Sequence, residues 1–128
     1  MGAPAYANMD PIRVTSKYPS LLRGLGFSDL RLDKPEYAVG ESIGFSVVIN
    51  FEAIKKGRIL RGSMIAYIDS GDAIEAEREI KSLVFTAGAN KTVPLHLIGP
   101  AATKPGEGKT FIVMGGDEAG DMVALNVV

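Results

Sequence analysis

The fold is decided by ten residues in which apolar and polar side chains alternate, SIGFSVVINF at positions 42–51. Large apolar residues occupy every second position, and these are Ile43, Phe45, Val47, Ile49 and Phe51. On the other positions, only Val48 interrupts a set of small or polar side chains. A helix would scatter the apolar residues around its axis, whereas a strand places them all on one face. The stretch therefore predicts a central β-strand with one face in a core.

Other segments show the same period of two. Residues 59–69 carry apolar side chains on both faces, which predicts a middle strand covered on both sides, or one whose outer face meets a partner. In residues 92–97, Val93, Leu95 and Leu97 alternate with other residues. Pro94 in this run predicts an edge strand, because proline lacks the N–H group that a central strand needs. Further strands are expected at 27–33, 109–114 and 122–128.

Residues 73–84, AIEAEREIKSLV, are ambiguous because they are rich in strong helix formers. In a strand, Ile74, Ala76 and Ile80 share one face with an inward Arg78. In a helix, the corresponding stripe would include Glu77 and is less apolar. The pattern favours a strand, and a helix over 73–81 is the alternative. The strand interpretation puts the acidic side chains on a solvated face, and these are Glu75, Glu77 and Glu79.

About seven expected strands, separated by 15 glycines and 7 prolines, predict an all-β fold of the sandwich type. Residues 1–26 show no sustained period, yet they are too apolar for an ordinary disordered tail. We interpret 1–26 as an extended N-terminal arm and 27–128 as the sandwich domain. We expect the arm to bind a partner through its larger apolar residues, which are Tyr6, Met9, Ile12, Val14, Tyr18, Leu21 and Leu22.

The turn between the first two expected strands, LDKPEYAVGESI at 32–43, resembles that of immunoglobulin-like modules of bacterial and archaeal adhesion proteins. The shared pattern is Lys-Pro-x-Tyr-x-x-Gly-Glu. Pro35 ends ladder pairing, Tyr37 can fold back onto the core, and Gly40 permits a positive φ. Segments 85–93 and 105–111 resemble strand corners of the same modules, so the likeness covers about residues 27–128.

The resemblance implies an immunoglobulin-like β-sandwich of about seven strands and carries over no functional residue. The cysteine pair and the tryptophan of antibody domains are absent from this chain. Modules of this type serve in adhesion, virion decoration and pilus assembly. The resemblance therefore indicates a structural or interaction role rather than a particular site.

The beginning of the sequence, MGAPAYANMDPIR, has no basic region followed by an apolar one, so we expect synthesis in the cytoplasm without a signal peptide. A virion surface protein combines such a start with an adhesion-type fold. We therefore expect a virion decoration or minor capsid protein, located on the virion surface if the protein is viral. The alternatives are an adhesin or pilus-type extracellular module and a soluble binding module such as a proteinase inhibitor.

Composition excludes several classes of function. The 14 basic and 15 acidic residues give a net charge of −1, which argues against binding nucleic acid or an anionic membrane. With no cysteine and one histidine, disulfides, thiolate sites and histidine-rich metal sites are excluded. No apolar run is long enough for a transmembrane helix. We expect no cofactor and no metal, and a protein partner, either another copy in a homo-oligomer or the major subunit of a larger assembly.

The motifs that could carry chemistry have simpler interpretations. GEGKT at 106–110 has Thr103 where a phosphate-binding loop needs its first glycine, and a strand pattern follows it instead of a helix. His96 is expected to be exposed or to face a partner. The acidic groups at 69–79 and 117–121 and the basic group at 55–61 are typical of solvated strands and turns. We therefore expect no catalytic residue and no enzyme activity.

Overall fold

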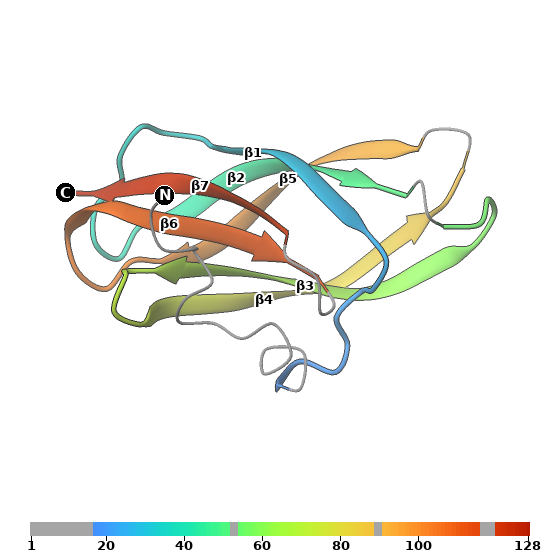
Figure 1. The fold of residues 1–128 in the computed structure, drawn as a ribbon, viewed down its shortest axis with the longest axis horizontal. Helices are drawn as coiled ribbons and strands as arrows, with labels where there is room; N and C mark the ends of the chain where they lie inside the picture. Colours follow the sequence, from blue (N-terminus) through green and yellow to red (C-terminus); the bar gives the residue numbers. More distant parts are fainter. Residues whose placement is uncertain (1–16, 52–53, 89–90, 116–119) are drawn as a thin grey trace.

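The computed structural model describes residues 17–51, 54–88, 91–115 and 120–128 (Figure 1). They contain seven β-strands, which are β1 (Gly26–Leu32), β2 (Ser42–Asn50), β3 (Ile59–Asp69), β4 (Ile74–Thr86), β5 (Thr92–Ala101), β6 (Gly106–Met114) and β7 (Asp121–Val127). All pairings are antiparallel and form two sheets, β1-β2-β5 and β4-β3-β6-β7. The sheets share one apolar core, as in a β-sandwich. The prediction of an all-β fold is confirmed.

β2 is the central strand of the three-stranded sheet, and its alternation determines which face is buried. Ile43, Phe45, Val47 and Ile49 are all fully buried in the core. The Phe45 ring packs against the ring of Phe111 in β6, with 5.1 Å between ring centroids. This contact joins the two sheets, so the strand predicted from SIGFSVVINF carries the centre of the core.

β3 is a middle strand of the four-stranded sheet and is buried on both faces. Met64, Ala66 and Ile68 belong to the core between the sheets. Ile65 and Tyr67 point to the opposite, outer face and belong to a second buried cluster. The prediction of a middle strand covered on both sides is confirmed.

β4 is a strand, so the helical alternative for 73–81 is wrong. A register shift opposite Ile68 and Asp69 leaves Glu75 as an extra, bulged residue, because Ile68 pairs with Ala76 and Asp69 with Ile74. Ala76 packs on the core, whereas Ile74 packs on the outer cluster. The prediction that Ile74 shares the face of Ala76 is therefore wrong, because the bulge reverses the alternation between them.

Arg78 lies opposite the buried Ala66, on the inward face that its position predicts. Its side chain is nevertheless exposed. β4 is the last strand of its sheet, so a long side chain on it can extend past the rim of the sandwich into solvent. An inward arginine is tolerated here because of the edge position.

The turn between β1 and β2 is closed by Tyr37, which is buried. Its hydroxyl donates a hydrogen bond to the carbonyl oxygen of Gly44 (3.0 Å) and accepts one from the backbone N–H of Lys34 (3.1 Å). Burial, the largest influence, raises the pKa of the phenol, so the neutral hydroxyl is available as a donor. Gly40 has a φ of 84°, the positive value expected from the sequence.

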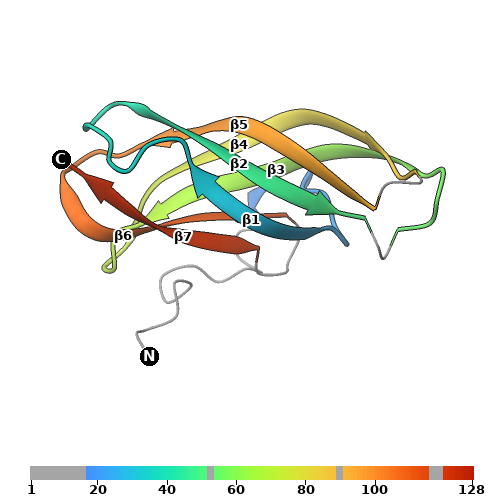
Figure 2. The ribbon, with the colours of Figure 1, turned by 90° about the horizontal axis from the view of Figure 1, so that it is seen from above.

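The free edges of the two sheets differ. β5 is an edge strand, as Pro94 predicts, and Pro94 pairs with Val48 of β2. β1 and β7 lie side by side in both views (Figures 1 and 2). The N–H group of Leu30 in β1 donates to Asp121 Oδ2 of β7 (3.0 Å), which links the two sheets along this side.

We predict that Phe45→Ala lowers the free energy of unfolding by about 3–5 kcal/mol, because it leaves a cavity against Phe111. Ser46→Ala, on the other face of the same strand, is the matched control and should cost less than about 1 kcal/mol. Urea unfolding followed by circular dichroism measures both. Equal losses at the two positions would contradict the one-sided burial of β2.

Candidate interaction surface

Residues 20–22 are built into the four-stranded sheet beside β3. The N–H group of Leu22 donates to the Ser63 carbonyl oxygen (2.8 Å), and the N–H group of Ser63 donates to the Ser20 carbonyl oxygen (2.9 Å). Leu21 forms a parallel bridge with Ser63. β6 pairs with β3 only from Ile65 onward, so residues 20–22 pair with β3 just before the place where β6 begins to pair.

Two glycines allow this close approach. A Cβ atom at Gly62 would lie 2.5 Å from the Ser20 carbonyl oxygen, and one at Gly115 would lie 2.9 Å from the Leu22 carbonyl oxygen. Both distances are too short for a real side chain, and both neighbours are backbone atoms that cannot easily move. The sequence around β3 and β6 is therefore adapted to hold the chain that precedes β1.

Leu21 and Leu22 are both buried, on opposite sides of the sheet. Leu22 belongs to the core between the sheets, and Leu21 belongs to the outer cluster. Their opposite directions follow from the extended backbone of this segment. These two predicted partner-binding residues thus pack within their own domain.

The outer cluster lies on the face of the four-stranded sheet that points away from the core. Its sheet residues are Ile65 and Tyr67 of β3 and Ile112 and Met114 of β6, and each has 0% exposure. Among the described residues, those packed with them are Leu21, Tyr18 and Ile74. An apolar face of this kind needs a cover, because large exposed apolar patches are rare on monomeric proteins.

The chain reaches this face through Lys17. Lys17 Nζ lies 2.9 Å from Glu77 Oε2, and Glu77 is the cross-strand partner of Tyr67. A turn follows, in which the N–H group of Leu21 donates to the Tyr18 carbonyl oxygen (3.3 Å). Lys17 therefore lies beside the outer cluster, whereas the next residues turn toward Ser63.

A groove of about 650 Å³ adjoins the cluster, between residues 17–20 and the β3–β4 ribbon. Arg61 and Lys81 line it together with Leu83 and Val84. Val84 is 53% exposed although it is a large apolar residue. The groove thus combines apolar contact area with charged side chains of both signs, since Glu79 also lines it.

Only some of the predicted partner-binding residues lie in the described part of the chain. Leu21 and Leu22 are buried, and Tyr18 is partly buried against the outer cluster. The other predicted residues lie outside the described part of the chain, and they are Tyr6, Met9, Ile12 and Val14. Their binding to a partner stays a prediction.

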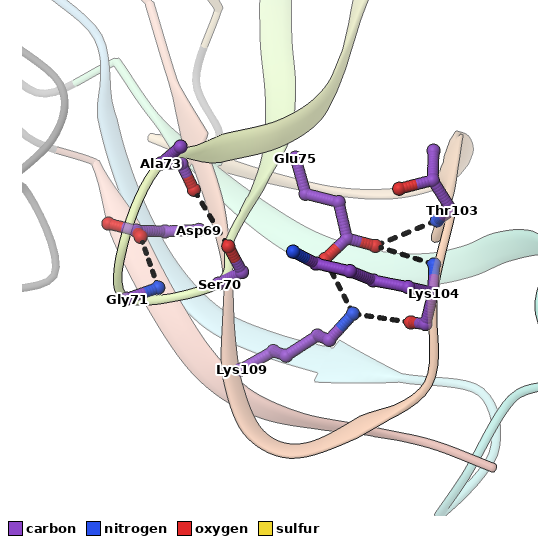
Figure 3. Close-up of polar contacts among 8 residues, drawn as sticks. All are labelled: Asp69, Ser70, Gly71, Ala73, Glu75, Thr103, Lys104 and Lys109. Carbon is purple, nitrogen blue, oxygen red and sulfur yellow. Dashed lines mark hydrogen bonds and ion pairs between the residues drawn. The ribbon is translucent and has the colours of Figure 1, made fainter.

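A buried ion pair closes one end of the core (Figure 3). Lys109 Nζ lies 2.5 Å from Glu75 Oε1 and donates to the carbonyl oxygen of Lys104 (2.5 Å). The other carboxylate oxygen, Glu75 Oε2, accepts hydrogen bonds from the N–H groups of Thr103 (2.7 Å) and Lys104 (3.3 Å). The side chains of Glu75 and Lys109 are only 2% and 5% exposed. The pair fastens the β5–β6 connection to β4.

This arrangement corrects the prediction that Glu75 is solvated. The bulge turns the Glu75 side chain inward, and no pattern of alternation could reveal this. The motif at 106–110 lies within β6, and the ammonium group of Lys109 already has two protein partners. The strand expected at 109–114 thus begins three residues earlier, and 106–110 is part of a strand rather than a turn between strands.

Burial opposes ionisation of Glu75, but the bonds from Lys109, Thr103 and Lys104 outweigh it and hold the pKa of this carboxyl below its usual value of 4.5. The ionised form is therefore favoured in the folded protein. It follows that the network stabilises the fold above about pH 4.5 and loses that contribution as the pH falls through the lower folded pKa.

His96 has a partner that the sequence did not reveal. Its Nε2 lies 2.7 Å from Asp33 Oδ2, above Gly44 of β2. A Cβ atom at Gly44 would overlap the Asp33 carboxylate, so the glycine makes room for the pair. Ser46 is the cross-strand partner of His96, but in the described part of the chain no hydrogen bond joins them. His96 is 58% exposed on an open sheet face, as expected.

The charged turns have local roles. Asp69 Oδ1 accepts a hydrogen bond from the N–H group of Gly71 (2.8 Å), and the Ser70 hydroxyl donates to the Ala73 carbonyl oxygen (3.1 Å), so this acidic group shapes the β3–β4 turn (Figure 3). Gly57, with a φ of 89°, forms the turn within the basic group. Of the acidic group at 117–121, only Asp121 is described.

No protein-family model matches the sequence, and no curated protein is similar enough to match it. Among the described residues, no group of three or more histidine, cysteine, aspartate or glutamate side chains could hold a metal ion. In the same part of the chain, no helix has the length and hydropathy needed to cross a membrane. The proposal about function therefore rests on the outer cluster, the adjoining groove and the segment that reaches them.

We predict that Lys109→Met lowers the free energy of unfolding by about 3–5 kcal/mol at pH 7, because it leaves the Glu75 carboxylate buried without its cation. Lys104→Met is the matched control. That lysine joins the network through its backbone and is exposed, so its substitution should cost less than about 1 kcal/mol. Urea unfolding measures both, and similar losses would contradict the role of the Lys109 ammonium group.

We also predict that the stability difference between the wild type and Glu75→Gln depends on pH. The wild type should be more stable at pH 7, where the carboxylate is ionised and bonded. Below about pH 4.5 its advantage should shrink as Glu75 binds a proton. Unfolding curves of both proteins at pH 7, 5 and 3 test this, and a constant difference would be inconsistent with it.

Proposed function

We propose that this protein is a non-catalytic structural protein that assembles with other protein subunits through its N-terminal arm. The observation that carries this proposal is the anchoring of residues 20–22. Backbone bonds to Ser63 and the burial of Leu21 and Leu22 hold the arm's base in the domain. The residues that precede Lys17 are thereby attached at a defined place, beside an apolar face and an open groove.

Within all-β folds, we propose an immunoglobulin-like sandwich. The sheet β4-β3-β6-β7 contains the third, sixth and seventh strands, the same set that shares one sheet in immunoglobulin domains. The first, second and fifth strands form the other sheet, as they do there, while β4 lies beside β3. The turn closed by Tyr37 also supports this assignment.

Two groups that could have carried chemistry are better explained by structural roles. Lys109 is buried and bonded to Glu75 and to the Lys104 carbonyl oxygen, so its ammonium group cannot reach a nucleotide phosphate. His96 lies on an exposed sheet face, where a substrate would find neither enclosure nor a bonded nucleophile among the described residues. These placements support a protein without enzyme activity.

As the specific role we propose a virion decoration or minor capsid protein, whose partner is another copy or a major structural subunit. A shell protein must contact neighbours in a fixed orientation, and an arm anchored at its base provides such a contact. The near-neutral charge supports association through apolar contacts rather than through binding to nucleic acid.

We predict that a full-length variant with serine at Tyr6, Met9, Ile12 and Val14 stays folded but loses assembly. These substitutions remove the arm's apolar side chains and leave its anchored base intact. Light scattering and sedimentation velocity should show a shift to smaller species, and circular dichroism should retain the β-sheet spectrum. The matched control carries serine at Ala3, Ala5, Ala7 and Asn8 and should assemble like the wild type. An unchanged size distribution in the first variant would refute assembly through the arm.

A further inference from the structure

The outer cluster is fully buried, although the apolar side chains packed on it from the described part of the chain are only Leu21, Tyr18 and Ile74. Ile65, Tyr67, Ile112 and Met114 span two adjacent strands and are fully buried, although they point away from the core. Such a face on the centre of a sheet is typical of a sheet packed between two layers. The three-stranded sheet is one layer, so the outer face needs a second one.

The position of Lys17 indicates which part of the chain can form this layer. Its ion pair with Glu77 puts the end of the undescribed N-terminal segment beside Tyr67. The segment has 16 residues and could extend to about 50 Å, which exceeds the roughly 35 Å length of β3. Its apolar side chains match the chemistry of the outer cluster, and these are Tyr6, Met9, Ile12 and Val14.

We propose that the outer cluster is the docking site for residues 1–16 and that a second copy of this chain supplies the segment in the assembly. This inference rests on the proposed function and specifies its partner and its contact surface. The groove lined by Leu83 and Val84 at the free edge of β4 gives the incoming segment further apolar contact area. Each copy thus receives an arm on the outer face of its four-stranded sheet.

Exchange between copies needs little rearrangement of the described residues. The Lys17–Glu77 pair is exposed, with 60% of the lysine side chain in solvent, and such pairs contribute little to stability. Pro19 and Ser20 of the following turn are exposed as well. The turn can therefore redirect the segment while Leu21 and Leu22 stay in place. Exchanged elements make the same contacts in both arrangements, which makes exchange an inexpensive route to oligomers.

Two full-length variants test the exchange by complementation. The first carries serine at Tyr6, Met9, Ile12 and Val14, so it lacks an apolar arm but keeps the docking face. The second carries Ile112→Lys, so it keeps the arm but places a charge in the docking face. Each should lack the wild-type oligomer when alone, and an equimolar mixture should form a 1:1 heterodimer in native mass spectrometry and sedimentation velocity.

Control variants distinguish a specific loss of assembly from unfolding. Val48→Lys introduces the same charge on the outer face of the other sheet, and this variant should assemble like the wild type. If circular dichroism shows that Ile112→Lys does not fold, Ile112→Thr replaces it. A peptide of residues 1–16 should bind the first variant, whose own arm carries the four serines. It should bind at least tenfold more weakly to a protein that carries both the four serines and the Ile112 substitution.

The outcomes distinguish this inference from the proposed function. A heterodimer in the mixture supports exchange through the outer cluster. If the wild type assembles through its arm but the mixture stays monomeric, the docking face or the exchange is wrong and assembly through the arm stands. If the wild type itself is monomeric at all concentrations, the proposed function fails and this inference fails with it.

Discussion

The central strands of the four-stranded sheet are apolar on both faces, and the rest of the structure depends on covering them. The inner face is covered by the three-stranded sheet, through contacts such as Phe45 against Phe111. The outer face of β3 and β6 receives Leu21 from the segment before β1. Because Leu22 enters the inner core at the same place, two consecutive residues tie the segment before β1 to both sides of the sheet. The attachment of the segment before β1 is therefore a consequence of the two-sided sheet.

The bulge in β4 has a comparable effect at the opposite end of β3. It directs Ile74 to the outer cluster and Glu75 to the end of the core, which reverses their expected faces. The inward carboxylate is tolerated because Lys109 and two backbone N–H groups surround it. A buried ion pair is not by itself a strong stabiliser, but the loss of one partner is costly. The pair thus specifies how the β5–β6 connection meets β4.

The alternation of apolar and polar side chains is sufficient to predict the strands. The turn at Tyr37 can also be recognised, because the residues that it bonds are close in the sequence. The sequence could not reveal the bulge at Glu75, since one extra residue in a ladder depends on the partner strand. The pairing of His96 with Asp33 was likewise hidden, because it depends on the register of three strands over Gly44. Leu21 and Leu22 were assigned to partner binding because their segment has no period. Their burial depends on Gly62 and Gly115, which lie far away in the sequence.

A sheet that is apolar on both faces exposes a protein to unwanted association wherever one face is left uncovered. An uncovered outer cluster would present contiguous apolar area, which promotes indiscriminate association. A cover formed by the arm avoids this, because the same side chains can be buried within one chain or between copies. Under the proposed exchange, the arrangement that prevails depends on protein concentration and on the turn at Tyr18 to Ser20, not on any new contact chemistry. Under the proposed exchange, the same apolar face would serve both to cover the sheet within one chain and to join two copies.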